Sequence, residues 1–207
     1  MKNTPNVTLY KIIRPIFSLL FKLYYNPTIL HKEYIPQKGS ALVAGNHKHA
    51  LDPIFVGVCT NRVLHSLAKK ELHEGKMGFF FRAVGSIPVD LQAESNKEAT
   101  ASAIKVLSNG GLIGISPEAK RNYTKELLLP FKFGAVSMAK KSNSVIVPYA
   151  ITGDYKFRSK NLKIVFGKAI NVSNMNLEEA NELLYKTVKI LLLQSLEGKK
   201  EHGEYIQ

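Results

Sequence analysis

Short apolar runs alternate along this chain with longer amphipathic stretches, and this alternation limits the possible folds more than any other feature. The runs at 41–44 and 112–115 are typical of buried strands, because they are short, apolar and bounded by glycine. Further strands are predicted at 63–68, 85–89, 145–151 and 162–166, and helices at 95–107, 131–141 and 176–196. Strands that alternate with helices predict an α/β sandwich, with a mixed, largely parallel sheet flanked by helices.

Two helices carry local signals at their starts. Asp52-Pro53 is expected to open a helix, with Asp52 as the N-cap and Pro53 at the first helical position. Ser95-Asn-Lys-Glu98 has the spacing of a capping box, and Gly110-Gly111 is expected to end the helix that follows it.

The segment at 7–25 predicts an amphipathic helix. Pro15 is expected to kink this helix or to divide it in two. A basic stripe beside a wide apolar face suits a membrane interface, although a helix that packs on the domain core produces the same pattern. Five polar residues recur every three or four positions and therefore share one face: Thr8, Lys11, Arg14, Ser18 and Lys22.

Composition bounds the classes of protein that remain. The 207 residues show no internal repeat or linker, so we predict one domain at 29–200, preceded by a membrane-associating amphipathic segment at 1–28. The 29 basic residues exceed the 16 acidic ones and give a net charge of +13, which indicates an anionic partner. A single cysteine excludes a disulfide framework. Charges interrupt the apolar stretch at 12–25, so no transmembrane helix is predicted.

The segment at 45–53 is the strongest candidate for catalysis. It follows a predicted strand and leads into a helix, where α/β sheets place their functional sites. A hydrogen bond from one ring nitrogen to the Asp52 carboxylate would fix the tautomer of His47 and stabilise its imidazolium, making His47 a general base for a hydroxyl. Two alternatives remain: Asp52 only caps its helix, or His47, His49 and Asp52 bind a metal ion.

The segment at 114–121 also follows a predicted buried strand. It resembles a Gly-x-Ser-x-Gly nucleophile elbow, but Glu118 replaces the last glycine, and Pro117 lacks the N–H that such an elbow aims at an oxyanion. A serine hydrolase is therefore not predicted. The segment instead offers a carboxylate at Glu118 and cations at Lys120 and Arg121, and an arginine fork suits a phosphate monoester.

Four sequence blocks follow one another within 30–170: Asn46-His47-x4-Asp52, Gly85-Ser-Ile-Pro-Val-Asp90, Pro117-Glu118 with Arg121, and Val147-Pro148. Together they resemble the blocks of the glycerolipid acyltransferases, and most of all those of the bacterial 1-acyl-glycerol-3-phosphate (lysophosphatidic acid) acyltransferases. The resemblance implies that an acyl chain passes from an acyl-CoA or acyl-carrier-protein thioester to a lysophospholipid hydroxyl. The expected acceptor is 1-acyl-glycerol-3-phosphate, and the expected product is phosphatidic acid, with no cofactor.

The same resemblance assigns roles to individual residues. It makes His47 the general base and Asp52 its orienting carboxylate, and it makes Arg121 a phosphate ligand. The two lysines at 69–70 are added as candidates for phosphate contact, with a solvated pair as the alternative. The full set of candidate substrate-binding residues is Asn46, Glu118, Lys120, Arg121, Lys69 and Lys70.

Two blocks depart from the family pattern. Leu91 stands where the family has an arginine, so a neighbour such as Lys69, Lys70 or Arg82 replaces that cation or the acceptor differs. Ala119 stands where the family has a glycine, and its Cβ restricts positive φ. We expect these departures to affect the identity of the acceptor more than the chemistry.

The resemblance and the charge together predict a peripheral enzyme on the cytoplasmic face of an anionic membrane, with no metal ion and no nucleic-acid partner. Two hypotheses from other classes stand beside it. One is a metal-dependent hydrolase that uses His47, His49 and Asp52, and the other is a basic nucleic-acid-binding module. The scattered basic residues, without an aromatic RNA-binding motif, disfavour the nucleic-acid module.

Overall fold

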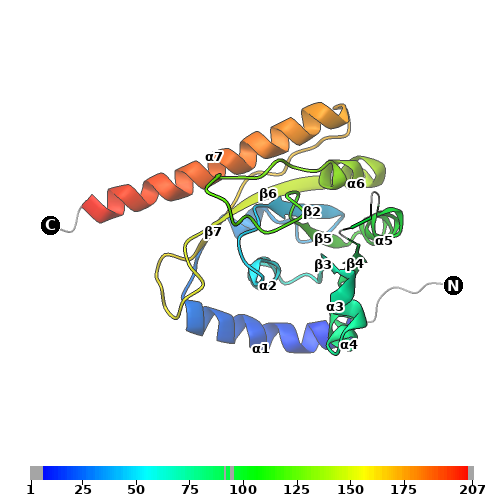
Figure 1. The fold of residues 1–207 in the computed structure, drawn as a ribbon, viewed down its shortest axis with the longest axis horizontal. Helices are drawn as coiled ribbons and strands as arrows, with labels where there is room; N and C mark the ends of the chain where they lie inside the picture. Colours follow the sequence, from blue (N-terminus) through cyan, green and yellow to red (C-terminus); the bar gives the residue numbers. More distant parts are fainter. Residues whose placement is uncertain (1–6, 91, 94–95, 205–207) are drawn as a thin grey trace.

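A seven-stranded sheet forms the centre of the protein (Figure 1). The computed structural model describes residues 7–90, 92–93 and 96–204, and side chains as far as 197. The strand order is β1-β7-β6-β2-β5-β3-β4, in which β6 and β7 pair antiparallel and the other neighbours pair parallel. This confirms the mixed, largely parallel sheet that the sequence predicted. The strands are β1 (Thr28–Leu30), β2 (Ala41–Gly45), β3 (Leu64–Lys69), β4 (Ile87–Val89), β5 (Leu112–Ile115), β6 (Val145–Thr152) and β7 (Lys163–Phe166).

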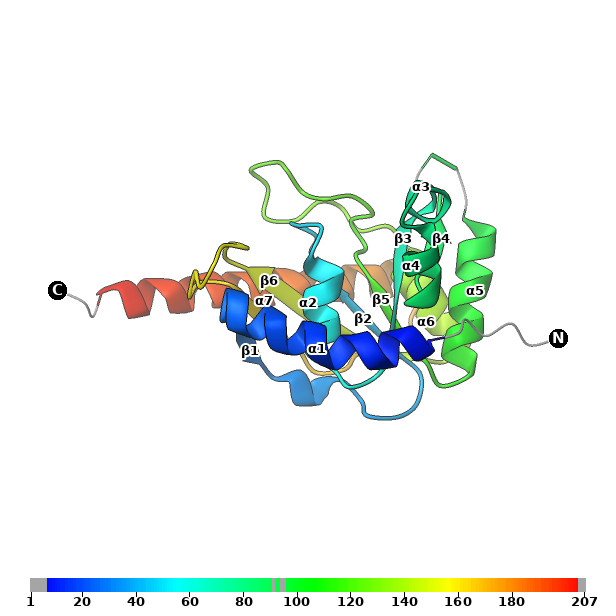
Figure 2. The same ribbon diagram turned by 90° about the horizontal axis from the view of Figure 1, so that it is seen from below.

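Helices cover both faces of this sheet (Figures 1 and 2). One face carries α5, α6 and α7, and the other carries α1 and α2, while α3 and α4 lie near β4. The α/β sandwich predicted from the alternating pattern is therefore confirmed. The helices are α1 (Thr8–Tyr25), α2 (Asp52–Val58), α3 (Lys70–Glu74), α4 (Gly78–Ala83), α5 (Lys97–Ser108), α6 (Gly134–Ser142) and α7 (Leu177–Glu204), with a 3-10 turn at Lys32–Tyr34.

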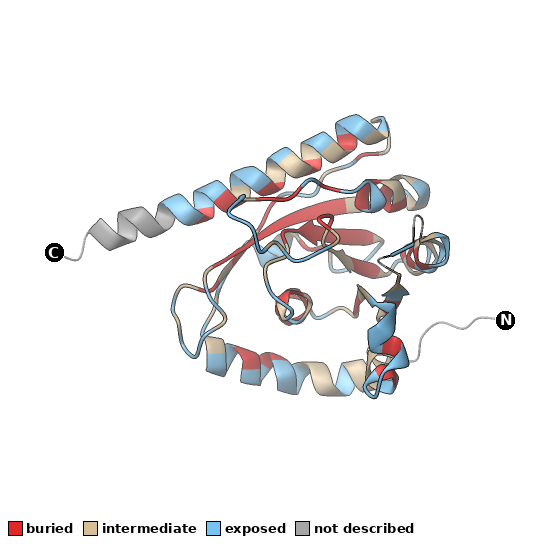
Figure 3. Cartoon of the chain, viewed as in Figure 1, coloured by how far each residue is buried: buried red, intermediate tan, exposed pale blue. Residues whose placement is uncertain are grey.

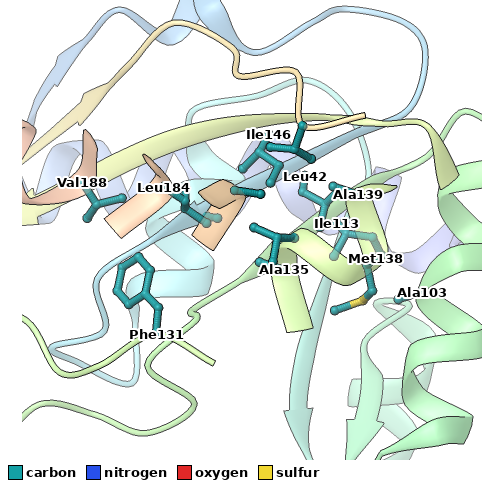
Figure 4. Packing of buried hydrophobic residues seen from close by; sticks show 14 of the residues in the cluster. Leu42, Ala103, Ile113, Phe131, Ala135, Met138, Ala139, Ile146, Leu184 and Val188 are labelled. Atoms are coloured by element: carbon teal, nitrogen blue, oxygen red, sulfur yellow. The ribbon is translucent and has the colours of Figure 1, made fainter. Parts of the chain in front are cut away.

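The central strand β2 is buried along its whole length and divides the core in two. Leu42 and Ala44 belong to the cluster beneath α5, α6 and α7, where alanines such as Ala135 allow the helices to approach the sheet closely (Figure 4). Ala41 and Val43 point to the opposite face and belong to the cluster with α1 and α2. This alternation follows from the two-residue period of a strand.

Several expected boundaries are corrected. Helix α1 runs unbroken through Pro15, and α7 continues to Glu204, beyond its expected end at 196. The N-cap of α2 is Leu51, so Asp52 is the first helical residue and the expectation that it caps this helix is wrong. The short elements β1, α3 and α4 were not predicted, because their segments show no clear hydrophobic period. The capping residue Ser95 and the departure at Leu91 lie outside the described residues.

Helix α1 lies across one face of the domain with its apolar side outward (Figures 2 and 3). Ser18 and Phe21 are buried, and Arg14 Nε donates to the Gly57 carbonyl of α2 at 3.4 Å. Arg14 therefore faces the domain, which corrects the expectation that it faces lipid headgroups. The outward side chains are 56–62% exposed: Ile12, Ile16, Leu19, Leu20 and Leu23. Among the described helices, none combines the length and apolar content needed to cross a bilayer.

Candidate active site

The segments selected from the sequence meet at one edge of the sheet. Strands β6, β2, β5 and β3 are neighbours and run in the same direction, so their carboxyl ends lie together. The loop with His47 follows β2, the loop at 116–133 follows β5, and the loop at 153–162 follows β6. The β2 loop is therefore flanked on both sides by loops from adjacent strands.

Gly45 and Asn46 determine how the chain leaves β2. A Cβ on Gly45 would lie 2.2 Å from the Tyr149 carbonyl oxygen of β6, so only glycine fits at this close approach. The Asn46 side chain then replaces the strand ladder: its Nδ2 donates to the Ile151 carbonyl at 2.9 Å, and its Oδ1 accepts from the Ile151 N–H at 2.7 Å. Asn46 is buried, and its amide holds the loop in place.

His47 and Asp52 form the hydrogen-bonded pair that the sequence predicted. His47 Nδ1 lies 2.8 Å from Asp52 Oδ2, and the His47 side chain is 22% exposed, whereas that of Asp52 is fully buried. With Nδ1 engaged by the carboxylate, Nε2 is the ring nitrogen that can take a proton from a bound hydroxyl. The same Oδ2 accepts the N–H groups of Lys48 and His49, both at 2.8 Å. Asp52 thus orders the loop that carries His47.

Glu118 fastens the His47 loop to the loop after β5. Its Oε1 accepts the His47 N–H at 2.7 Å, and its Oε2 accepts the Leu129 N–H at 2.8 Å. Burial raises the pKa of Glu118, and the two backbone donors oppose that rise. The Asn122 N–H donates to the His47 carbonyl at 2.7 Å, so His47 is held through both of its backbone groups. The sequence predicts that Glu118 binds substrate. In the structure its buried carboxylate binds backbone N–H groups instead.

Arg121 and Lys120 are exposed on this same loop. Arg121 lies next to Asn122, and its guanidinium carbon lies 5.3 Å from the centre of the Tyr123 ring. The loop bonds described above bring the backbone of Arg121 beside the His47 loop. Ala119 adopts a left-handed φ of +58° in the turn between Ser116 and Lys120.

Lys69 and Lys70 lie farther from the pair. They stand where β3 ends and α3 begins, two strands from β2 and so about 10 Å away across the sheet. Both are exposed, and Lys70 Nζ lies 3.6 Å from Glu74 Oε1. Lys70 and Arg82 line a cavity of about 1290 Å³ between α1, α3, α4 and α5, whose described lining does not include His47.

One residue of this site, Tyr155, is not indicated by the sequence. The Tyr155 hydroxyl, from the loop after β6, donates to Asp52 Oδ1 at 2.6 Å. No motif marks Tyr155, because its loop is polar and it lies 103 positions from its partner. Only the pairing of β2 with β6 brings the two residues together.

The same geometry bears on the metal alternative and on the single cysteine as a nucleophile. Among the described residues, no three His, Cys, Asp or Glu side chains are grouped to hold a metal ion. His49 Nδ1 accepts the Leu51 N–H at 3.2 Å, and its ring stacks on Tyr155. Cys59 is buried at the end of α2, and burial raises the pKa of its thiol to about 12. A thiol in this state is a poor nucleophile.

Comparisons with known proteins agree with the family resemblance of the sequence. The Acyltransferase family model matches residues 26–152. The 1-acyl-sn-glycerol-3-phosphate acyltransferase of Bacillus subtilis is 27% identical over 79% of this chain and 83% of its own length. The enzyme of that name from Borreliella burgdorferi is 32% identical over 68% of this chain and 56% of its own.

A solved structure adds the fold. The crystal structure of the 1-acyl-sn-glycerophosphate (LPA) acyltransferase PlsC from Thermotoga maritima superposes with a TM-score of 0.73. It covers 89% of this chain and 78% of its own, at 21% identity. The matched family model spans β1 to β6 and therefore contains both halves of the His47–Asp52 pair. The chain belongs to the acyltransferase family and is an O-acyltransferase.

Proposed function

We propose that this enzyme transfers a fatty acyl chain from a thioester to the free hydroxyl of 1-acyl-glycerol-3-phosphate and forms phosphatidic acid. The observation that carries the proposal is the 2.8 Å contact between His47 Nδ1 and the buried Asp52 Oδ2 at the carboxyl edge of the sheet. The names of the relatives support this acceptor.

In the proposed mechanism, His47 Nε2 takes the proton of the acceptor hydroxyl while the hydroxyl oxygen attacks the thioester carbonyl. The new C–O bond forms and the C–S bond breaks, and the proton passes from His47 to the departing thiolate. Asp52 holds the ring orientation and stabilises the imidazolium that forms between these steps. No covalent acyl-enzyme is needed, which fits the buried state of Cys59.

Arg121 is the proposed ligand of the acceptor phosphate. It is exposed, and it lies one residue from Asn122, whose N–H binds the His47 carbonyl. An arginine can bind a phosphate with two parallel hydrogen bonds, which would orient the acceptor beside the base. The neighbouring Lys120 adds charge to the same loop, while Lys69 and Lys70 are assigned a weaker, longer-range role because of their distance across the sheet.

We further propose that residues 1–28 dock the enzyme on the cytoplasmic face of an anionic membrane. The outward face of α1 supports this assignment, because a contiguous apolar surface on a helix suits the boundary between headgroups and acyl chains. Lys11 and Lys22 are exposed on one flank of that face and can contact anionic headgroups.

A direct assay tests the reaction. Purified protein is given lysophosphatidic acid with acyl-CoA or with acyl-carrier protein, and lipid products are separated. Phosphatidic acid should form with at least one donor. If neither donor gives product while other lysophospholipids are acylated, the assigned acceptor is wrong; if no acceptor is acylated, the proposed reaction is wrong.

Variants of the pair test the mechanism. His47→Ala should lower kcat by about a thousandfold, within the range of general-base catalysis, and Asp52→Asn should also lower it strongly. The exposed His31 provides the control, and His31→Ala should keep normal activity. His49→Ala separates this mechanism from a metal site, because a metal ligand would be as essential as His47. An equal loss in both variants, with the activity of the unaltered protein abolished by chelators, would favour a metal site in this loop.

Arg121 is tested through acceptor binding. Arg121→Ala should raise the KM for lysophosphatidic acid at least tenfold, since a charge-assisted pair contributes about 1.5–3 kcal/mol. Arg121→Lys should recover only part of the loss, because lysine keeps the charge and lacks the fork. An unchanged KM in both variants would assign the phosphate to another cation.

A further inference from the structure

We propose that the Tyr155 hydroxyl is a positioning group of the catalytic pair, which holds the Asp52 carboxylate and through it the ring of His47. This inference rests on the proposed role of His47 as the general base. Tyr155 lies in the loop at 153–162 and outside the four sequence blocks that carry the family resemblance.

The hydrogen bonds at Asp52 are divided between its two oxygens. Oδ2 accepts from His47 Nδ1 and from the N–H groups of Lys48 and His49. Oδ1 accepts from the Tyr155 hydroxyl at 2.6 Å, the one donor to this oxygen among the described residues. Because Asp52 is fully buried, an unpaired Oδ1 would be a desolvated charged atom. The tyrosine therefore holds Oδ1 in place, and this fixes the orientation of the carboxylate in which Oδ2 points toward His47.

Tyr155 is itself held in place from two sides. Its ring stacks on His49 with centroids 4.4 Å apart, and it meets Phe55 of α2 edge-on at 6.2 Å. Phe21 and Tyr25 of α1 also meet it edge-on, at 6.4 and 5.8 Å. These contacts leave the hydroxyl little freedom to turn away from Asp52.

The loop around Tyr155 is also fixed. Lys48 Nζ donates to the Gly153 carbonyl, and the Arg158 N–H donates to the Tyr24 carbonyl of α1 at 2.8 Å. Burial and the neighbouring Asp52 charge raise the pKa of Tyr155, so the hydroxyl stays protonated and acts as a donor. One end of the loop thus contacts the His47 loop, and the other contacts α1.

The test is Tyr155→Phe, which removes the hydroxyl and keeps the ring. We expect kcat to fall about ten- to a hundredfold, the range for losing a hydrogen bond to a charged group, with the KM of both substrates within about twofold. The side-chain nitrogen and proton signals of His47 in NMR spectra should also shift. Tyr185→Phe is the control, because Tyr185 is a half-buried tyrosine on α7 that packs on Phe131. Both residues lie on the face of the sheet opposite Tyr155.

The outcomes separate this inference from the proposed function. An unchanged kcat in Tyr155→Phe, with His47→Ala inactive, overturns the role of Tyr155 alone. A fully active His47→Ala overturns the general base on which that role rests. A lower free energy of unfolding, with unchanged kcat and unchanged His47 signals in the folded variant, would make Tyr155 merely structural. A measurement on the unaltered protein needs no variant: the Tyr155 hydroxyl proton should appear far downfield and exchange slowly, and a rapidly exchanging proton contradicts the hydrogen bond.

Discussion

At Ala119 the chain adopts a backbone conformation that its residue type disfavours. Its φ of +58° lies in the left-handed region, where a Cβ costs about 1–2 kcal/mol relative to glycine. The turn is held by the Ala119 N–H to the Ser116 carbonyl at 3.0 Å and by the Glu118 carboxylate beside it. The surrounding bonds thus impose a conformation on alanine that the family pattern gives to glycine.

Ala119→Gly should therefore relieve strain. Glycine is also more flexible in the unfolded chain, which costs about 0.4–1 kcal/mol, so the free energy of unfolding is expected to rise by at most about 1.6 kcal/mol. Urea unfolding measures it, with Ala101→Gly in the middle of α5 as a control that should destabilise by about 1 kcal/mol. If Ala119→Gly lowers the free energy of unfolding, the backbone of Ala119 is not strained.

Glu118 is the second residue whose environment leads to a prediction. Glu118→Gln keeps the shape and replaces one acceptor oxygen with an NH2 group, so one of two backbone N–H groups loses its partner. The free energy of unfolding should fall by about 1–3 kcal/mol. Turnover should fall as well, since one of those N–H groups belongs to His47.

The difference in the free energy of unfolding between the wild type and Glu118→Gln should also depend on pH. A carboxyl whose pKa is raised by folding contributes stability that is present below its unfolded pKa and lost as the pH rises through its folded pKa. Glutamine does not titrate. The wild type should therefore exceed Glu118→Gln in stability most at low pH, and the gap should narrow as the pH rises. A gap that widens contradicts the raised pKa.

At the scale of elements, α1 presents two faces with separate tasks. Phe21 points inward, stacks on Phe55 at 5.2 Å and contacts Tyr155, whereas Leu19 and Leu23 are more than half exposed. The sequence predicted the helix and its two faces, because both follow from spacing. It did not indicate which face meets the domain, because that depends on the shape of α2 and the loop at 153–162.

Substitutions on the outward face should affect membrane binding alone. Leu19→Ser with Leu23→Ser should weaken binding to anionic vesicles at least tenfold, because each leucine buried in lipid contributes about 1.5–3 kcal/mol. Turnover of a short-chain, water-soluble acceptor should not change. Ile190→Ser, at an exposed position of α7, is the control. Vesicle flotation measures the effect, and full binding by the double variant would show that α1 is not the docking element.

The inward face should behave in the opposite way. Phe21→Ala removes a buried aromatic ring and is expected to destabilise the protein by about 3–5 kcal/mol. Turnover should fall even with the soluble acceptor at a temperature where the variant is folded, because the ring supports Tyr155. Normal turnover in the folded variant would show that Phe21 of α1 does not support the catalytic pair.

Across the whole molecule, the two edges of the sheet have different roles. The carboxyl edge carries His47, Asp52 and Tyr155, and the amino edge carries a structural arginine. Arg62 donates to the carbonyls of Pro36, Gly39 and Gly110 at 2.6–2.8 Å, and so joins the segments that lead into β2 and β5. Arg62 is half-buried, and its partial burial lowers the pKa of the guanidinium.

Arg62→Met should therefore change stability and spare catalysis. The loss of three charge-assisted bonds is expected to lower the free energy of unfolding by about 2–4 kcal/mol, with kcat unchanged where the protein is folded. Lys189→Met, on the exposed side of α7, is the control and should change stability by less than about 0.5 kcal/mol. A large loss of kcat in the folded variant would contradict this division between the edges.

The sequence by itself determined the α/β architecture, most strand positions and the pairing of His47 with Asp52. These depend on near neighbours: strand and helix periods are local, and the two residues are only five positions apart. The tertiary structure alone decided the partners that hold the pair, namely Glu118 at 71 positions from His47 and Tyr155 at 103 positions from Asp52. Strand order brings such groups together, and no local spacing records it, because chain separation and spatial distance are unrelated once a parallel sheet has formed.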